Sequence, residues 1–357
     1  MWIVLYVLLG LIGLFALVSV VTWLLYVPMI VRVFGEMPWL QAENAPPVPD
    51  AEPCEFTTAD GVTLRGSYMR TTAPMRLGVI GFCHEYSGDR WGAVPYTNGL
   101  RERGFDVFTF DFRNHGGSDR TPGYEPMPWL TNYELADVRA AVDYLTSRAD
   151  ADFAGIGLIG VSRGANAAIC AAAGDERVRA VVTDGAFPIG AMQRHYMRRF
   201  MDIYITPWWI GRRLPDVCLK SYCGWANLVA GWRQKCRFAS PEQFTRRVTQ
   251  PVFMIHGERD AYIPLEVVHN LRASLGGRSK LWTVPGAKHN GAIKKAAREY
   301  HRRIARFFEK HLAGGRTRAE SLRRAPKTAE PHAFAKPSAA ERRPQAVPCA
   351  SNKDAPV

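Results

Sequence analysis

The segment Gly160-Val161-Ser162-Arg163-Gly164 constrains the fold of this chain more than any other stretch of its sequence. The apolar run Ile156–Val161 predicts a buried strand, and the alanine-rich run from Ala165 predicts a helix. A turn from strand to helix within so few residues crowds the backbone on both sides of Ser162, and only glycine tolerates that crowding. The segment therefore predicts a serine whose Oγ projects from the end of a sheet.

Short buried strands alternate with amphipathic helices along the chain, after a hairpin around Asp60-Gly61. This alternation is typical of a mainly parallel sheet with helices on both faces, so the predicted fold class is α/β. The predicted strands are Glu55–Thr58, Val62–Met69, Leu77–Cys83, Phe105–Phe110, Ile156–Val161 and Val178–Asp184, and the predicted helices are Ala93–Arg103, Tyr133–Arg148 and one beginning at Ala165.

The alternation stops after Phe187, and roughly sixty residues pass before the next apolar strand begins at Val252. A loop of that length without secondary structure is uncommon in a compact domain, so residues 188–247 are predicted to form a helical lid. We interpret the lid tryptophans as a small hydrophobic core, with a wall for a bound ligand as the alternative. These are Trp208, Trp209, Trp225 and Trp232.

Four further segments place polar residues directly after predicted strands, and with the serine segment they make five motifs in a fixed order. They are Leu77–Ser87, which contains His84-Glu85-Tyr86; Phe105–Ser118; Val252–Pro264, which contains Asp260; and Leu281–Asn290, which contains His289. From about Cys54 to Leu312 the chain resembles the α/β-hydrolase superfamily. Within it, the chain looks most similar to the serine-aminopeptidase-like and the Bem46-like hydrolases, of which the latter are membrane-anchored.

This resemblance implies a mostly parallel eight-stranded sheet with a helical cap inserted over the active site. It also implies a catalytic triad, because Ser162, Asp260 and His289 follow the chain order of the family. A serine hydroxyl is a weak nucleophile until a base takes its proton. His289 is the expected base, and Asp260 is expected to orient its imidazole and to stabilise the imidazolium.

The backbone N–H groups of Tyr86 and Arg163 are the expected oxyanion hole. Arg163 follows the nucleophile, and Tyr86 occupies the family's position after a His-Gly dipeptide. Here Glu85 replaces that glycine. If the loop needs a conformation that only glycine adopts easily, Glu85 strains it. Alternatively, its carboxylate attracts a cationic group of the substrate or pairs with Arg90.

Other residues compete for these roles. Asp184 ends a strand and is the rival of Asp260, while His256 and His269 are the rivals of His289. The remaining polar residues of the motifs are interpreted as structural, namely His84, Asp111, Arg113 and His115. No Cys, His and Asp set has the spacing of metal ligands, and no glycine-rich loop indicates a nucleotide, so no cofactor is expected.

The first residues predict a single membrane anchor over 1–31, because Trp2 to Val31 contains no charged side chain and is long enough to cross a bilayer. A cleaved signal peptide is the alternative, but no basic residue precedes the run and no clear cleavage site follows it. Residues 32–53 are predicted to be a proline-rich linker. Residues 313–357, which are basic and lack apolar periodicity, are predicted to be a disordered tail.

Charge next to the anchor and cysteine usage indicate on which side of the membrane the hydrolase domain lies. Arg32 is the basic residue close to the anchor, which favours a cytoplasmic hydrolase domain under the positive-inside rule. The seven cysteines are an odd number without a CxxC pair, which also favours a reducing compartment. Cys218, Cys223 and Cys236 are clustered, so a disulfide on the other side of the membrane remains an alternative.

The formal net charge of +13 is concentrated in two regions, the lid and the segment from Lys294 to Arg324. Anionic phospholipid headgroups beside the anchor are the expected partner of this charge. The alternative is a solvated basic face on the helix Lys294–His311. Nucleic acid is not expected, because no recognised binding motif accompanies the charge.

The sequence therefore predicts a membrane-anchored serine hydrolase that cleaves an ester, thioester or amide through an acyl-serine. The aromatic, basic lid favours an amphiphilic acyl substrate, although this fold hosts many chemistries. A serine peptidase acting on small peptides is one alternative. The other is a non-catalytic membrane adaptor that retains the fold and binds lipid or a partner protein.

Overall fold

The computed structural model describes residues 2–35, 42, 45–151, 155–204 and 213–312. The predicted tail, 313–357, and the lid residues Trp208 and Trp209 lie outside this described part. The predictions for them are neither supported nor opposed.

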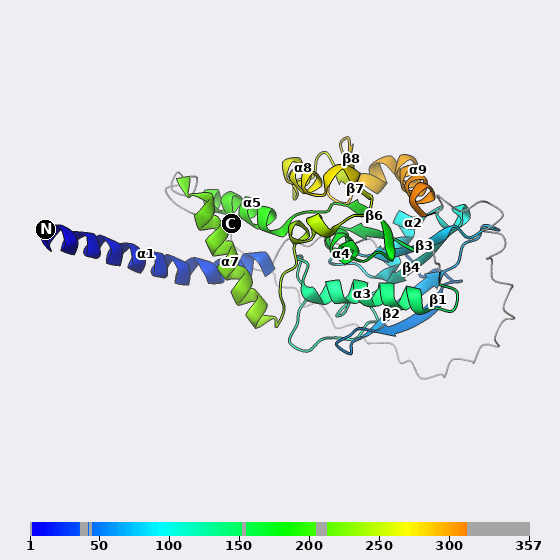
Figure 1. Ribbon diagram of the computed structural model, residues 1–357, viewed down its shortest axis with the longest axis horizontal. Coiled ribbons are helices and arrows are strands. Elements are labelled where there is room, and N and C mark those ends of the chain that lie inside the picture. The colour runs from blue at the N-terminus through cyan, green and yellow to red at the C-terminus, as the bar shows by residue number, and fades with distance from the viewer. Residues whose placement is uncertain (1, 36–41, 43–44, 152–154, 205–212, 313–357) are drawn as a thin grey trace, which may run out of the picture. The chain divides into compact units, whose positions relative to one another are not determined.

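An eight-stranded sheet forms the centre of the fold, with the strand order β1-β2-β4-β3-β5-β6-β7-β8 (Figure 1). Strand β2 pairs antiparallel with β1 and β4, and all other pairs are parallel, so the predicted mostly parallel sheet is confirmed. The central strands are buried on both faces, as parallel strands covered by helices require. The strands are β1 Glu52–Thr57, β2 Thr63–Met69, β3 Gly78–Cys83, β4 Phe105–Phe110, β5 Ile156–Val161, β6 Val178–Asp184, β7 Val252–Gly257 and β8 Ser279–Val284.

Helices cover both faces of the sheet, and each face has its own hydrophobic core. On one face, α3 (Asn132–Ser147), α4 (Arg163–Ala172) and α8 (Leu265–Ser274) pack against the strands. On the other, α2 (Ala93–Thr97) and α9 (Ala292–Leu312) do so. The carboxyl ends of the parallel strands therefore share one edge, where ligand sites form in open α/β sheets.

The helix predicted over Ala93–Arg103 is wrong in its second half. Helix α2 ends at Thr97, and a separate 3₁₀ turn follows at Arg101–Arg103. Gly99 has φ +77°, a left-handed conformation that a continuing right-handed helix does not contain. Asn98, with φ −54° and ψ 133°, has already left the helical conformation, so the helix ends before this glycine.

The lid is helical in its described part, as predicted. Helix α5 (Ile189–Tyr204) packs against α7 (Asp216–Arg233), and the amides of Gln193 and Asn227 exchange hydrogen bonds of 2.7 and 2.9 Å between them. The prediction that the lid tryptophans form a small core is wrong for the two described ones. Trp225 is 46% exposed and Trp232 is 80% exposed, because smaller residues of α7 fill the buried face.

Helix α1 (Trp2–Gly35) continues four residues beyond the predicted anchor 1–31, and β1 includes the last two residues of the predicted linker 32–53. The extension is explained by a tertiary contact. Phe34 is buried against the ring of Trp129, and Trp129 Nε1 donates a 3.1 Å hydrogen bond to the Phe34 carbonyl. Strand β1 begins at Glu52 because that residue already pairs with Tyr68 of β2.

Candidate active site

Ser162 lies at the turn between β5 and α4, in the strained backbone conformation φ 51°, ψ −115°. The two flanking glycines make this turn possible. A Cβ on Gly160 would lie 2.3 Å from the Gly164 carbonyl oxygen, and a Cβ on Gly164 would lie 2.1 Å from the Cys83 carbonyl oxygen. These distances are far below van der Waals contact, so the glycines are a steric requirement, as the sequence predicts.

Ser162, His289 and Asp260 form a hydrogen-bonded series. Ser162 Oγ lies 3.1 Å from His289 Nε2, and His289 Nδ1 lies 2.7 Å from Asp260 Oδ2. Asp260 Oδ1 accepts hydrogen bonds of 2.8 and 2.9 Å from the backbone N–H groups of Tyr262 and Ile263. These two amides fix the carboxylate, which in turn fixes the imidazole with Nε2 towards the serine.

The ionisation of the pair follows from the same contacts. Burial alone would raise the pKa of Asp260, but the hydrogen bond and charge of His289 hold it below its usual value. Burial alone would lower the pKa of His289, but the Asp260 carboxylate, with smaller effects of Asp184 and Glu85, holds it above the usual value. A histidine in this position is a stronger base than free imidazole.

The rival residues lie in other environments. Asp184 ends β6 with its carboxyl group buried, and burial raises its pKa to about 7. Its backbone oxygen, not its side chain, accepts a 2.8 Å hydrogen bond from Ser162 N–H. His256 Nε2 donates to the Ile263 carbonyl at 3.0 Å and lies 3.8 Å from Asp260, so it supports the Asp260 loop. His269 is exposed on α8.

The expected oxyanion donors are the backbone N–H groups of Tyr86 and Arg163. Within the described part of the chain neither N–H has a hydrogen-bond acceptor, and Tyr86 lines the same small cavity as Ser162. Arg163 is also the first residue of α4, whose N-terminal amides have no acceptor within the helix. Two amides without acceptors beside a serine are suited to a developing negative charge.

The side chain of Arg163 has a structural role that the sequence did not reveal. It is fully buried, donates a 3.0 Å hydrogen bond to the Met127 carbonyl and forms an ion pair of 3.5 Å with the buried Glu134. Glu134 is held in turn by Thr131, the N-cap residue of α3, whose hydroxyl donates a hydrogen bond to the Glu134 carboxylate. This interior contact anchors the residue that follows Ser162.

His84 and His115 hold loops together, as interpreted from the sequence. His84 Nε2 accepts a 3.1 Å hydrogen bond from the backbone N–H of Phe112. His115 Nε2 lies 2.8 Å from the Tyr86 carbonyl oxygen. Burial, together with the charge of Arg163, lowers the pKa of His115 to about 4, so the ring is neutral at pH 7.

Glu85 neither strains its loop nor pairs with Arg90. It has no positive φ, so the loop does not need the glycine-like conformation that would strain it. Arg90, its expected partner, instead donates a 2.8 Å hydrogen bond to Asp111. The Glu85 carboxylate accepts a short hydrogen bond from the side-chain amide of Asn290. Sequence reasoning missed Asn290, whose only signal was its place next to His289.

A narrow cavity of about 50 Å³ opens at Ser162 and His289. Its walls are mainly aromatic and aliphatic, and two of them, Met192 and Tyr196, come from lid helix α5. The complete lining is Tyr86, Pro128, Trp129, Ser162, Phe187, Met192, Tyr196, Tyr262, Ile263 and His289. Such a cavity fits an uncharged acyl group next to the serine.

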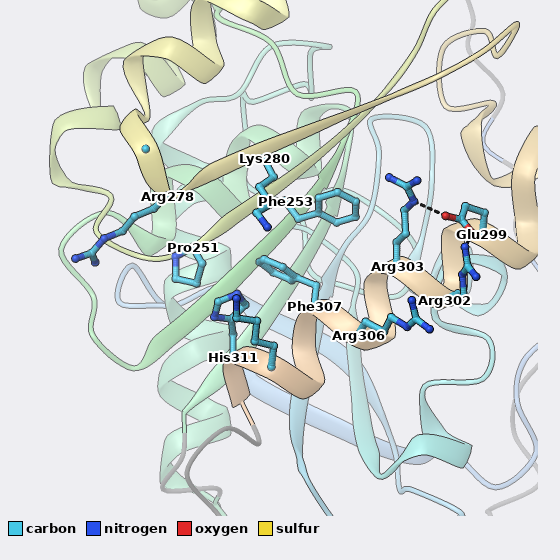
Figure 2. A pocket seen from close by; sticks show the side chains of 12 residues that line it. Pro251, Phe253, Arg278, Lys280, Glu299, Arg302, Arg303, Arg306, Phe307 and His311 are labelled. Atoms are coloured by element: carbon cyan, nitrogen blue, oxygen red, sulfur yellow. Dashed lines mark hydrogen bonds and ion pairs between the residues drawn. The ribbon is translucent and has the colours of Figure 1, made fainter.

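A wider basic groove, of about 770 Å³, lies along α9 and away from Ser162 (Figure 2). Arg302 and Arg303 line it and both pair with Glu299, and Arg303 also covers the ring of Trp282. The Glu299 carboxylate offsets part of the positive charge of this groove. Among the described residues no group of three or more His, Cys, Asp or Glu side chains could hold a metal ion.

Helix α1 is the one described helix that is long and apolar enough to cross a membrane, judged by length and composition. Nearly all its described side chains from Trp2 to Val21 are exposed, whereas Val27 and Phe34 are buried. The core helix of a soluble protein would be buried along its apolar length.

The six described cysteines, including Cys218, Cys223 and Cys236, form no disulfide bond.

Comparison with known proteins agrees with this architecture. Residues 81–216 match the family described as α/β hydrolase fold, and residues 220–313 match the family described as TAP-like protein. Among curated sequences, the uncharacterized protein YfhR of Escherichia coli K12 is 26% identical over 267 residues, which cover 73% of this chain and 78% of YfhR. The uncharacterized protein Rv2307c of Mycobacterium tuberculosis is 28% identical over 237 residues, 65% of this chain and 70% of the relative.

Two solved esterases have the same fold. The Pyrococcus furiosus esterase Pf2001 aligns with a TM-score of 0.56 at 22% identity, covering 77% of this chain and 99% of the esterase. The esterase domain of a Rhodothermus marinus protein aligns with a TM-score of 0.51 at 17% identity, covering 74% and 99%.

Proposed function

The chain belongs to the α/β-hydrolase superfamily, and from this premise we propose that it is a membrane-anchored serine hydrolase acting on an acyl ester or thioester. The observation that carries the proposal is the series Ser162–His289–Asp260, with contacts of 3.1 and 2.7 Å beside an apolar cavity. The fold alone would not assign an activity, because it hosts many chemistries.

In the proposed reaction, Ser162 Oγ attacks the carbonyl carbon of the substrate while His289 Nε2 takes the hydroxyl proton. The carbonyl oxygen becomes an oxyanion, which the N–H groups of Tyr86 and Arg163 stabilise; one such donor is typically worth ~3–4 kcal/mol. The bond to the leaving group then breaks, and His289 gives its proton to the departing oxygen or sulfur. Asp260 stabilises the imidazolium that exists between these transfers.

The second half of the reaction regenerates the enzyme. Water attacks the acyl-serine and His289 takes its proton, so that the acyl–Oγ bond breaks and the proton returns to Ser162. The net change is the addition of one water molecule across the ester or thioester bond. The aromatic and aliphatic walls of the cavity support an uncharged acyl group as the part that lies beside Ser162.

The anchor part of the proposal is supported by α1. Its exposed apolar portion, Trp2 to Val21, is long enough for a hydrocarbon core of ~30 Å. The remainder of the helix packs on the hydrolase domain through Phe34 and Trp129. A signal-peptide cut after Phe34 would remove the contact with Trp129, which lines the cavity at Ser162.

Hydrolysis of 4-nitrophenyl acetate by the detergent-solubilised full chain tests the proposal. We expect turnover by the wild type and a loss of about 10³-fold or more in kcat for Ser162→Ala and for His289→Ala. His269→Ala, at an exposed histidine on α8, is the matched control and should retain activity. A folded wild type without turnover on acetyl, butyryl and thioester substrates would favour the adaptor alternative.

A further inference from the structure

Helix α7 of the lid presents large apolar side chains to solvent. Val217 is 70%, Leu228 61% and Trp232 80% exposed, and Trp225 is 46% exposed. Outside α1, these four are the exposed large hydrophobic side chains of the described chain. An apolar patch of this kind on a soluble surface usually marks a binding site for a protein or a membrane.

The four residues lie on one face of the helix. Their spacings of eight, three and four residues keep them within the same sector of a 3.6-residue turn. A separate set of residues, Leu219, Cys223 and Ala226, is buried against the rest of the protein. Packing of the lid therefore does not explain the exposed set, which we call the α7 apolar face.

The α7 apolar face meets helix α1 at Trp225. Thr22 Oγ1 lies 2.8 Å from the Tyr222 hydroxyl, and the rings of Trp23 and Trp225 meet edge to face at 5.6 Å. Figure 1 shows α7 crossing α1. A helix that crosses the end of a membrane span lies at the level of the lipid headgroups, where Trp and Tyr side chains are enriched.

We propose that α7 lies in the interface of the bilayer that α1 spans, with the α7 apolar face turned into the lipid. This inference rests on the proposed membrane anchor. Continuity with α1 favours lipid over a second copy of the chain, and the exposed cations Lys220 and Arg233 on the same helix suit anionic headgroups. The hydrolase domain is thus held to the membrane at two places, the anchor and the lid.

This placement connects the lipid surface with the active site. Helix α7 is joined to α5 by the paired amides of Gln193 and Asn227. Helix α5 in turn supplies Met192 and Tyr196 to the cavity at Ser162. An amphiphilic substrate would therefore enter beside the lid, from the membrane side, and the acyl group would pass α5 to reach the serine.

The test places an environment-sensitive NBD label at one introduced, exposed cysteine per variant of the full chain in lipid nanodiscs. Cys218 and Cys349 are replaced by serine, and the other five native cysteines are buried. The label positions are Leu228→Cys on the α7 apolar face, Leu11→Cys within α1 and Asn270→Cys on α8, where the side chain is exposed. Quenching by lipids carrying a nitroxide at carbon 5 or carbon 12 is compared with quenching by iodide in the water.

We expect the label at residue 228 to be quenched at least about threefold more by the carbon-5 lipid than by iodide. Residue 11 should respond best to the carbon-12 lipid, and residue 270 to iodide. Iodide quenching at 228 with lipid quenching at 11 would overturn the docking of α7 and leave the anchor intact. Iodide quenching at both would overturn the anchor and the docking together. Protection of the label at 228 from iodide only in discs that hold two chains would overturn lipid docking and favour contact with a second copy of the chain.

Discussion

The Glu85 carboxylate accepts a hydrogen bond from Asn290, and so the loop after β3, which carries Tyr86, is joined to the loop after β8, which carries His289. This contact therefore fixes the position of Tyr86, an expected oxyanion donor, relative to His289, the expected base. The residue that replaces the family's glycine thus has a place in the site, as an acceptor for the neighbour of His289.

Glu85→Gln is expected to move the acidic limb of the kcat/KM profile to lower pH. The Glu85 charge contributes to raising the pKa of His289, so its removal lowers that pKa. His289 must be neutral to take a proton, and a lower pKa keeps it neutral at lower pH. The profile of Glu266→Gln, at an exposed residue on α8, is the control. An unchanged limb, or a limb moved to higher pH, contradicts the assignment.

Gly164→Ala is expected to destabilise the protein by at least about 3 kcal/mol, because the added Cβ would lie 2.1 Å from Cys83 O and 2.5 Å from His84 O. Gly224→Ala on α7 is the matched control. It meets nothing within 4 Å and should be neutral or stabilising by about 0.5–1 kcal/mol. Thermal unfolding of both variants in detergent measures the difference, and equal melting temperatures would disprove the steric argument.

Asp260→Asn should lower kcat by about 10³–10⁴-fold, because the amide no longer selects the tautomer of His289 that accepts from Ser162. Asp184→Asn should stay within about tenfold of the wild type, since Ser162 contacts only the backbone oxygen of Asp184. Ester hydrolysis at pH 8 distinguishes the two carboxyl groups. A larger loss for Asp184→Asn would move the acid of the triad to β6.

The buried carboxyl group of Asp184 predicts a pH-dependent stability difference. Its pKa rises from 3.8 to about 7 on burial, so the folded state holds a proton that the unfolded state has lost between these values. Stability from this group is present below about pH 4 and is lost as the pH rises through about 7. Asp184→Asn stays neutral throughout.

The expected gain in unfolding free energy for Asp184→Asn is therefore larger at pH 8, by about 1–3 kcal/mol, than at pH 5. Melting temperatures of wild type and variant at the two pH values measure it. A gain that is equal at both pH values would mean that Asp184 carries no such shift.

Much of this site was predictable because its constraints are local in sequence. The glycines around Ser162 follow from a backbone that turns within five residues, and the structure gives the contacts that require them. The mostly parallel sheet followed from the alternation of strands and helices, whereas the order of its strands came only from the structure. The structure also brings Ser162, His289 and Asp260 together, while their catalytic roles stay predictions.

Contacts between distant residues were not predictable in the same way. Glu85 and Asn290 are 205 residues apart, and no periodicity relates them. The Arg163–Glu134 ion pair requires knowledge of where α3 packs on α4. The exposure of Trp225 and Trp232 was missed because hydrophobicity alone does not tell whether an apolar residue is packed against protein or exposed.

The central claim, that Ser162 is an activated nucleophile, is tested most directly with a fluorophosphonate probe on the solubilised full chain, with mass spectrometry to locate the adduct. We expect stoichiometric labelling at Ser162, with no labelling of Ser162→Ala and labelling at least about 10³-fold slower for His289→Ala. A folded wild type that takes up no probe, or labelling at another serine, would contradict it.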